Sequence, residues 1–212
     1  MLLIKNGEKF MVPPIQTNQI NNDDSIKVLE SQIRECFGRV VFTHKTHEKC
    51  SDIYAEQLKK LKLFEIILSA LTTTSLLSSV FGDQKIGTII GAIFSTIILG
   101  ITIYTKDYDL GQIAKSHADT AHKLWNIREL YISLIADIKS TNLTIEQIKI
   151  KRDELQESLI LVYQNALRTN YKSYEMASKS LNKNGQINTG EEMTFSDEEI
   201  DRFLPRDLRR TP

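Results

Sequence analysis

The fold is decided by residues 63–106, which read LFEIILSALTTTSLLSSVFGDQKIGTIIGAIFSTIILGITIYTK. Two runs in this stretch, residues 66–82 and 86–105, carry no formal charge and flank a short turn. A helix needs about 20 apolar residues to cross a hydrocarbon core of roughly 30 Å. Helices are expected because the chain must satisfy its own backbone polar groups in lipid. The stretch therefore predicts a transmembrane helical hairpin with spans at about residues 63–82 and 86–105.

The first run is the weaker of the two, because it is short and rich in Ser and Thr. Leu63 and Phe64 extend it toward a full crossing. Glu65 lies near its start, where a carboxylate reaches the headgroups at a much smaller cost than at mid-bilayer. Both runs are therefore interpreted as spanning helices.

The composition alone resembles that of a soluble protein, with 212 residues, 27 basic and 27 acidic side chains and 41% hydrophobic residues. The apolar residues, however, are concentrated in the hairpin and the charged residues in its flanks. A net charge of zero gives no reason to expect direct binding of nucleic acid. Cys36 and Cys50 are too few for a disulfide framework, and the N-terminus lacks the long apolar core of a secretory signal.

The orientation of the hairpin follows from lysines near the spans, because positive charges are retained in the cytoplasm. Lys59, Lys60 and Lys62 precede the first span and Lys106 follows the second, whereas the turn holds Lys85 alone. We therefore expect a multi-pass protein of the cell inner membrane with both termini in the cytoplasm.

The segments before the hairpin predict an arm and a helix. Residues 1–24 contain Pro13, Pro14 and a polar run, and are expected to form a loosely ordered arm. Residues 25–62 contain no proline and lead directly into the first span, so they predict one long cytoplasmic helix.

Residues 107–180 repeat apolar side chains at spacings of three and four, which predicts a cytosolic pair of antiparallel helices. Thr144 and Gln147 form a capping-box pattern at the start of the second helix. With residues 25–62, this pair would form a three-helix bundle. The predicted fold class is thus an all-α membrane protein, a two-transmembrane hairpin with a cytosolic helical bundle.

The tail, residues 181–212, predicts a linker and a short C-terminal helix. The linker is marked by Asn182, Asn184, Gly185, Asn188 and Gly190. Ser196 and Glu199 form a second capping box. The segment would either remain a solvated tail or dock on the bundle or on a partner through its apolar residues: Phe195, Ile200, Phe203 and Leu204.

Three side chains before the membrane, His44, His47 and Cys50, are of types that bind zinc. On a helix, the spacing turns the outer two roughly 240° apart, so one ion does not reach all three readily. Packing between helices or subunits is the favoured role. We predict no metal site, no cofactor and no catalytic residues, because no nucleophile motif or phosphate loop is present.

The two spans carry polar and small residues on defined faces. In the first span a polar stripe groups Glu65, Ser69, Thr72, Ser75 and Ser79. In the second span a small-residue face contains Gly87, Gly91, Ser95 and Thr102. Small residues let membrane helices approach closely, whereas a polar stripe also suits the lining of a water-filled pore. Both interpretations, helix packing and pore lining, remain open at this stage.

Several motifs are similar in order and spacing to those of the SLATT family, the SMODS and SLOG-associating two-transmembrane effectors of prokaryotic conflict systems. They are FTHKTHEKCSDIY, LSALTTTSLLSSVFGD, YTKDYDLGQIAKSHADTAHKLWNIRELY, KRDELQES and TFSDEEIDRFLP. The resemblance covers most of the chain and implies a non-enzymatic effector.

The resemblance further implies a homo-oligomer that breaches the lipid bilayer in antiphage defence by abortive infection. Its trigger would be a cyclic nucleotide second messenger or a partner sensor such as a reverse transcriptase. The alternative is a non-conducting membrane adaptor that recruits a partner through its cytosolic bundle.

Overall fold

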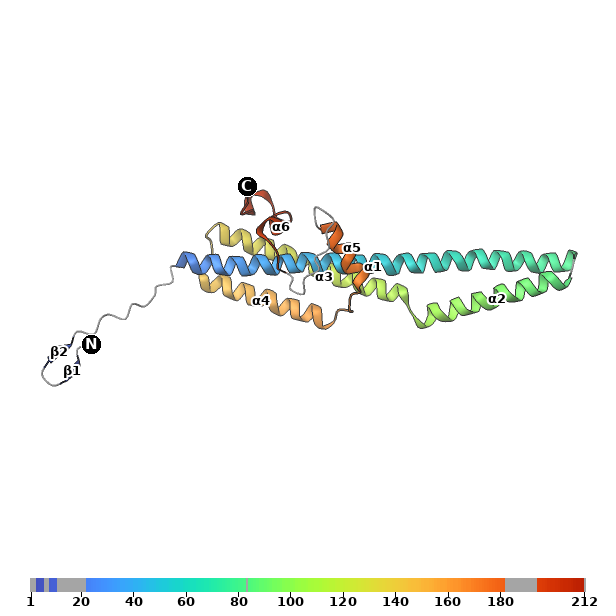
Figure 1. The fold of residues 1–212 in the computed structure, drawn as a ribbon, viewed down its shortest axis with the longest axis horizontal. Helices are drawn as coiled ribbons and strands as arrows, with labels where there is room; N and C mark the ends of the chain where they lie inside the picture. Colours follow the sequence, from blue (N-terminus) through green and yellow to red (C-terminus); the bar gives the residue numbers. More distant parts are fainter. Residues whose placement is uncertain (1–2, 6–7, 11–21, 83, 182–193, 212) are drawn as a thin grey trace.

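A computed structural model describes residues 3–5, 8–10, 22–82, 84–181 and 194–211 of the chain. Its elements are β1 (Leu3–Lys5), β2 (Glu8–Phe10), α1 (Asn22–Phe81), α2 (Gln84–Asp107), α3 (Leu110–Lys139), α4 (Ile145–Gln164), α5 (Tyr171–Leu181), α6 (Asp197–Asp201) and the 3-10 helix η1 (Arg206–Leu208). The predicted class, an all-α hairpin protein with a helical bundle, is confirmed (Figure 1).

Helix α1 is the axis of the molecule (Figure 1). Its 60 residues contain no proline, so the hydrogen-bond ladder is unbroken from the bundle into the hairpin. At 1.5 Å per residue, such a helix is about 90 Å long. One half packs in the bundle, and the other half pairs with α2.

The N-terminal arm, predicted to be loosely ordered, contains two short strands. Strands β1 and β2 pair antiparallel, with Leu3 opposite Phe10. In sequence they flank Asn6-Gly7, a dipeptide that favours two-residue hairpin turns. Pro13, Pro14 and the rest of the arm up to residue 21 lie outside the described residues, and α1 begins at Asn22 rather than at residue 25.

The bundle is built by α3 and α4 along the first half of α1. The predicted capping box at Thr144 and Gln147 is confirmed at the start of α4. Large side chains from the three helices are fully buried at its centre: Ile33, Phe37 and Val40 of α1, Leu124, Tyr131 and Ile135 of α3, and Ile148 of α4. Burying each such side chain contributes roughly 1.5–3 kcal/mol.

A further helix, α5, lies where the sequence predicts only a helical pair before the linker. It packs on α1 through three small residues, Ser173, Ala177 and Ser178. The helix has only 11 residues and its fully buried positions hold small side chains, so its sequence resembles the polar linker that follows. The five predicted linker residues between 182 and 190 lie outside the described residues.

The end of the chain docks on the bundle rather than projecting from it. We call residues 194–211 the C-terminal clasp. The predicted capping box of Ser196 and Glu199 is confirmed. Ile200 and Leu204 enter the hydrophobic core, while Phe195 lies against Gly38, where a Cβ would be 3.0 Å from its ring. The glycine therefore provides the space that the clasp occupies.

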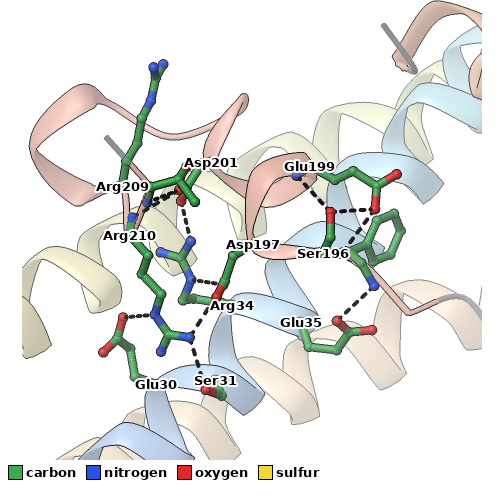
Figure 2. Close-up of polar contacts among 12 residues, drawn as sticks. Glu30, Ser31, Arg34, Glu35, Ser196, Asp197, Glu199, Asp201, Arg209 and Arg210 are labelled. Carbon is green, nitrogen blue, oxygen red and sulfur yellow. Dashed lines mark hydrogen bonds and ion pairs between the residues drawn. The ribbon is translucent and has the colours of Figure 1, made fainter. Parts of the chain in front are cut away.

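A buried ion pair joins the clasp to α1 (Figure 2). The Arg34 guanidinium, 1% exposed, donates to the Asp201 carboxylate and to the backbone oxygen of Leu208, the latter at 3.1 Å. Burial raises the pKa of Asp201, but hydrogen bonds from Thr211 and Arg34 outweigh it and lower the pKa to about 2. The aspartate is therefore charged at neutral pH.

A second arginine, Arg210 of the clasp, also joins the clasp to α1 (Figure 2). Arg210 donates to Glu30 at 3.1 Å and to Ser31 at 3.2 Å on α1. Its backbone amide also donates to Asp201 at 3.0 Å. These contacts hold the start of α1 and the end of the described chain together, so both lie on the same side of the hairpin.

We predict that Asp201→Asn loosens the clasp, because it leaves the buried Arg34 charge with the more distant and half-exposed Asp197, 3.4 Å away, as its remaining counter-ion. Removing one partner of a buried pair costs about 3 kcal/mol or more. Thermal denaturation of the full chain in detergent should show a lower midpoint, and limited proteolysis should cut the clasp sooner. Asp207→Asn is the matched control, because Asp207 is exposed in the same segment. Equal protection of both variants would contradict this role of the ion pair.

Candidate functional site

The candidate site is the hairpin formed by the second half of α1 and by α2. Both helices contain a stretch long and apolar enough to cross a membrane, and the rest of the chain buries only 6% and 11% of these stretches. Many of the exposed side chains are large and apolar: Leu63, Phe64, Ile66, Ile67, Leu71, Leu76, Leu77, Val80, Phe81, Ile86, Ile89, Ile90, Ile93, Ile97, Leu99 and Ile103.

This surface is too apolar to be left in water. Removing a large apolar side chain from water is worth roughly 1.5–3 kcal/mol. For the whole hairpin the gain is therefore on the order of 20 kcal/mol. That exceeds the net stability of an ordinary domain, about 5–15 kcal/mol. Lipid around the hairpin would cover these apolar side chains, so their exposure needs no covering protein.

The polar stripe of the first span lies mostly between the two helices. Thr72, Ser75 and Ser79 are half-buried, as is Glu65, whereas Ser69 is exposed. The Glu65 carboxylate accepts a hydrogen bond of 2.9 Å from the hydroxyl of Thr102 on α2. Within one chain, the stripe thus serves helix packing. A role in lining a pore remains a prediction.

Hydroxyl groups of the first span are satisfied locally. Ser69 donates to the backbone oxygen of Glu65, and Thr72 to that of Leu68, both at 2.8 Å. Ser79 donates to the backbone oxygen of Leu76 at 2.7 Å. Such bonds remove the cost of an unpaired hydroxyl in lipid. The span can therefore be rich in Ser and Thr and still insert.

The predicted small-residue face of α2 contacts α1 only in part within one chain. Gly87 and Gly91 are buried against α1. A Cβ at position 87 would lie 2.6 Å from the backbone oxygen of Ser75, so the helices approach as closely as a glycine allows. Ser95 is exposed instead of facing α1, and the half-buried Phe94 and Ile98 continue the contact. The spacing of three and four along α2 turns position 95 outward.

The histidines and cysteine before the membrane are buried, and they reach different helices. His47 Nδ1 lies 2.9 Å from His117 Nδ1 of α3, and Cys50 donates to the Ser173 hydroxyl of α5 at 2.8 Å. His44 packs edge-on against Trp125, with ring centroids 5.3 Å apart. Helix packing, the role favoured from the sequence, is confirmed for these side chains.

The buried surroundings of these histidines favour the uncharged form of the imidazole ring. Burial lowers the pKa of His47, and His117 and His44 lower it further, to about 4. Burial also lowers the pKa of His117. One neutral ring must donate to the other, because two protonated rings at this distance would repel. In the described part of the chain, no three His, Cys, Asp or Glu side chains are arranged to hold a metal ion.

A single protein family matches both the hairpin and the bundle of this chain. The sequence model of SMODS and SLOG-associating 2TM effector domain family 4 matches residues 29–199. This range covers α1 from Leu29 onward, both spans, the bundle and the start of the clasp. No curated protein and no solved structure matches the chain.

We predict that Gly87→Ala weakens the hairpin, because its methyl group would meet the backbone oxygen of Ser75. Forcing a methyl group into a packed contact costs about 1–3 kcal/mol. Unfolding of the full chain in mixed detergent micelles should report this loss. Gly100→Ala on the same helix is the control, because nothing lies within 4 Å of its Cβ position. If both variants unfold alike, close approach at Gly87 does not stabilise the hairpin.

Proposed function

The chain belongs to SMODS and SLOG-associating 2TM effector domain family 4, and from this premise we propose that it breaches the inner membrane in bacterial antiphage defence. The family is one of membrane effectors and is not a known enzyme class. In the proposed mechanism, triggered subunits oligomerise, form a pore and abort infection by killing the host cell. Oligomers are required because one two-helix hairpin cannot enclose water.

The observation that carries the proposal is the enclosed polar face of the hairpin. Glu65, Thr72, Ser75 and Ser79 lie toward α2, while the outside carries mostly large apolar side chains, with hydroxyls such as that of Ser69 among them. This arrangement suits a resting state that presents lipid with an apolar surface. A conducting state needs polar groups toward water, since a narrow apolar pore dewets and closes. Separation of α1 from α2 in the oligomer would expose these polar groups to the water in the pore.

The trigger would act on the cytosolic bundle. The start of α1 and the end of the described chain meet in the clasp, and basic residues flank the spans on this same side, which supports a cytoplasmic location. A nucleotide second messenger or a partner sensor, such as a reverse transcriptase, would bind there. Because α1 is continuous, a rotation of its first half would be carried directly into the first span.

A non-conducting adaptor is the second candidate. Helix α4 exposes apolar side chains on the bundle, including Ile150, Ile160 and Leu161. An exposed apolar face of this kind is typical of a surface that binds a protein partner. An adaptor would recruit its partner without any change in membrane permeability.

A disulfide across the hairpin tests the proposal. A Cβ at position 91 would lie 3.8 Å from the Cβ of Ser75, close to the mean separation of about 3.8 Å in disulfides. Ser75→Cys with Gly91→Cys, in a Cys36→Ser background, should therefore crosslink α1 to α2. Planar bilayers containing the purified oligomer should show conductance when the protein is reduced and loss of conductance when it is oxidised.

The single variants Ser75→Cys and Gly91→Cys are the controls and should conduct under both conditions. Conductance by the fully crosslinked protein would mean that the enclosed face does not line the pore. Absence of conductance from every form, including the parent, would favour the adaptor.

A further inference from the structure

A groove lies where the bundle meets the membrane hairpin. It has a volume of about 520 Å³, within the range of small-molecule sites. Its walls are mostly apolar and come from α1 and the first turns of α3: Ala55, Leu58, Leu63, Ile66, Gly111 and Ala114. A Cβ at position 111 would lie 3.3 Å from the side chain of Leu58, so Gly111 keeps the groove open.

The groove crosses the boundary between water and lipid. Along α1 it extends from Ala55 to Ile66, about 16 Å at 1.5 Å per residue. The headgroup layer on each side of a bilayer is only about 6 Å thick. Leu63 and Ile66 belong to the first span, and they are 57% and 66% exposed. One end of the groove therefore lies among acyl chains, and the other lies among headgroups.

Two lysines line the groove at headgroup level, Lys59 and Lys62. Within the described residues, neither has a carboxylate at salt-bridge distance. Lys60, between them in sequence, lies on another face of α1 and pairs with Glu56 at 2.8 Å. The nearby Asp109 carboxylate caps α3 and accepts a hydrogen bond from the amide of Gln112. The groove thus combines an apolar floor with two unneutralised positive charges.

We propose that this groove binds one anionic phospholipid of the cytoplasmic leaflet. Its phosphate lies between Lys59 and Lys62, and an acyl chain lies along Leu58, Leu63 and Ile66. The charge of the lysines selects an anionic headgroup over a zwitterionic one, because only the former gains net attraction. The apolar floor selects a lipid over a soluble phosphate, because a free anion would leave that floor in water.

This site has a consequence for the hairpin. Lipid in the groove contacts α1 just before the first span and α3 just after the second, so it joins the two ends of the membrane hairpin. The proposal requires that the hairpin inserts into a bilayer. It does not require that the protein breaches the membrane. An adaptor would bind the same lipid.

The test uses the full chain in detergent micelles that contain equal amounts of phosphatidylcholine and phosphatidylglycerol. Native mass spectrometry should detect the protein with one retained phosphatidylglycerol. A lysine near an anionic headgroup contributes about 1 kcal/mol, so Lys59→Gln with Lys62→Gln should lower affinity roughly 25-fold. Ala55→Phe should lower retention as well, because its ring fills the groove without changing the charge. Excess inorganic phosphate should not displace the lipid.

Lys60→Gln is the matched control, since it removes the same charge from another face of the same turn. The proposal is overturned if Lys60→Gln loses as much lipid as the double variant, because binding would then reflect charge density alone. It is also overturned if Ala55→Phe retains lipid like the parent, or if inorganic phosphate displaces the lipid. The proposal also fails if the protein retains phosphatidylcholine as strongly as phosphatidylglycerol, because the site would then not select an anionic headgroup.

Discussion

The structure depends on one constraint, that backbone polar groups in hydrocarbon must find their partners within the chain. An unbroken helix meets this constraint. Helix α1 contains no proline, so its backbone hydrogen bonds continue from the bundle to the turn. Hydroxyls such as those of Ser69 and Thr72 meet it by donating to the preceding helical turn. The same helix can therefore belong to a water-soluble bundle at one end and to a lipid-covered hairpin at the other.

The two halves of α1 are held by different forces. In the bundle, apolar side chains such as Phe37 leave water, and the ion pair of Arg34 and Asp201 fixes the tail over them. In the hairpin, lipid is as apolar as the side chains, so close packing at Gly87 and the bond between Thr102 and Glu65 take over. Under the proposed function, a trigger would rearrange these contacts between α1 and α2.

The sequence predicted features that depend on local chemistry. The spans, both capping boxes and the class of the fold follow from runs, spacings and short motifs. It did not predict that Arg34 pairs with Asp201, 167 residues away, because periodicity identifies a buried face but not its partner. Helix α5 was missed because it packs through small polar residues such as Ser173. Within one chain Ser95 does not join the contact with α1, because small size alone does not define a contact face.

Topology mapping tests the central claim most directly, that residues 63–106 cross the membrane twice and keep the bundle and clasp on one side. Reporter fusions at Met1 and directly after Lys106 should both report the cytoplasm, and a fusion within residues 83–85 should report the outside. Opposite locations for Met1 and Lys106 would contradict the account. They would mean that the first, Ser- and Thr-rich run does not cross the bilayer.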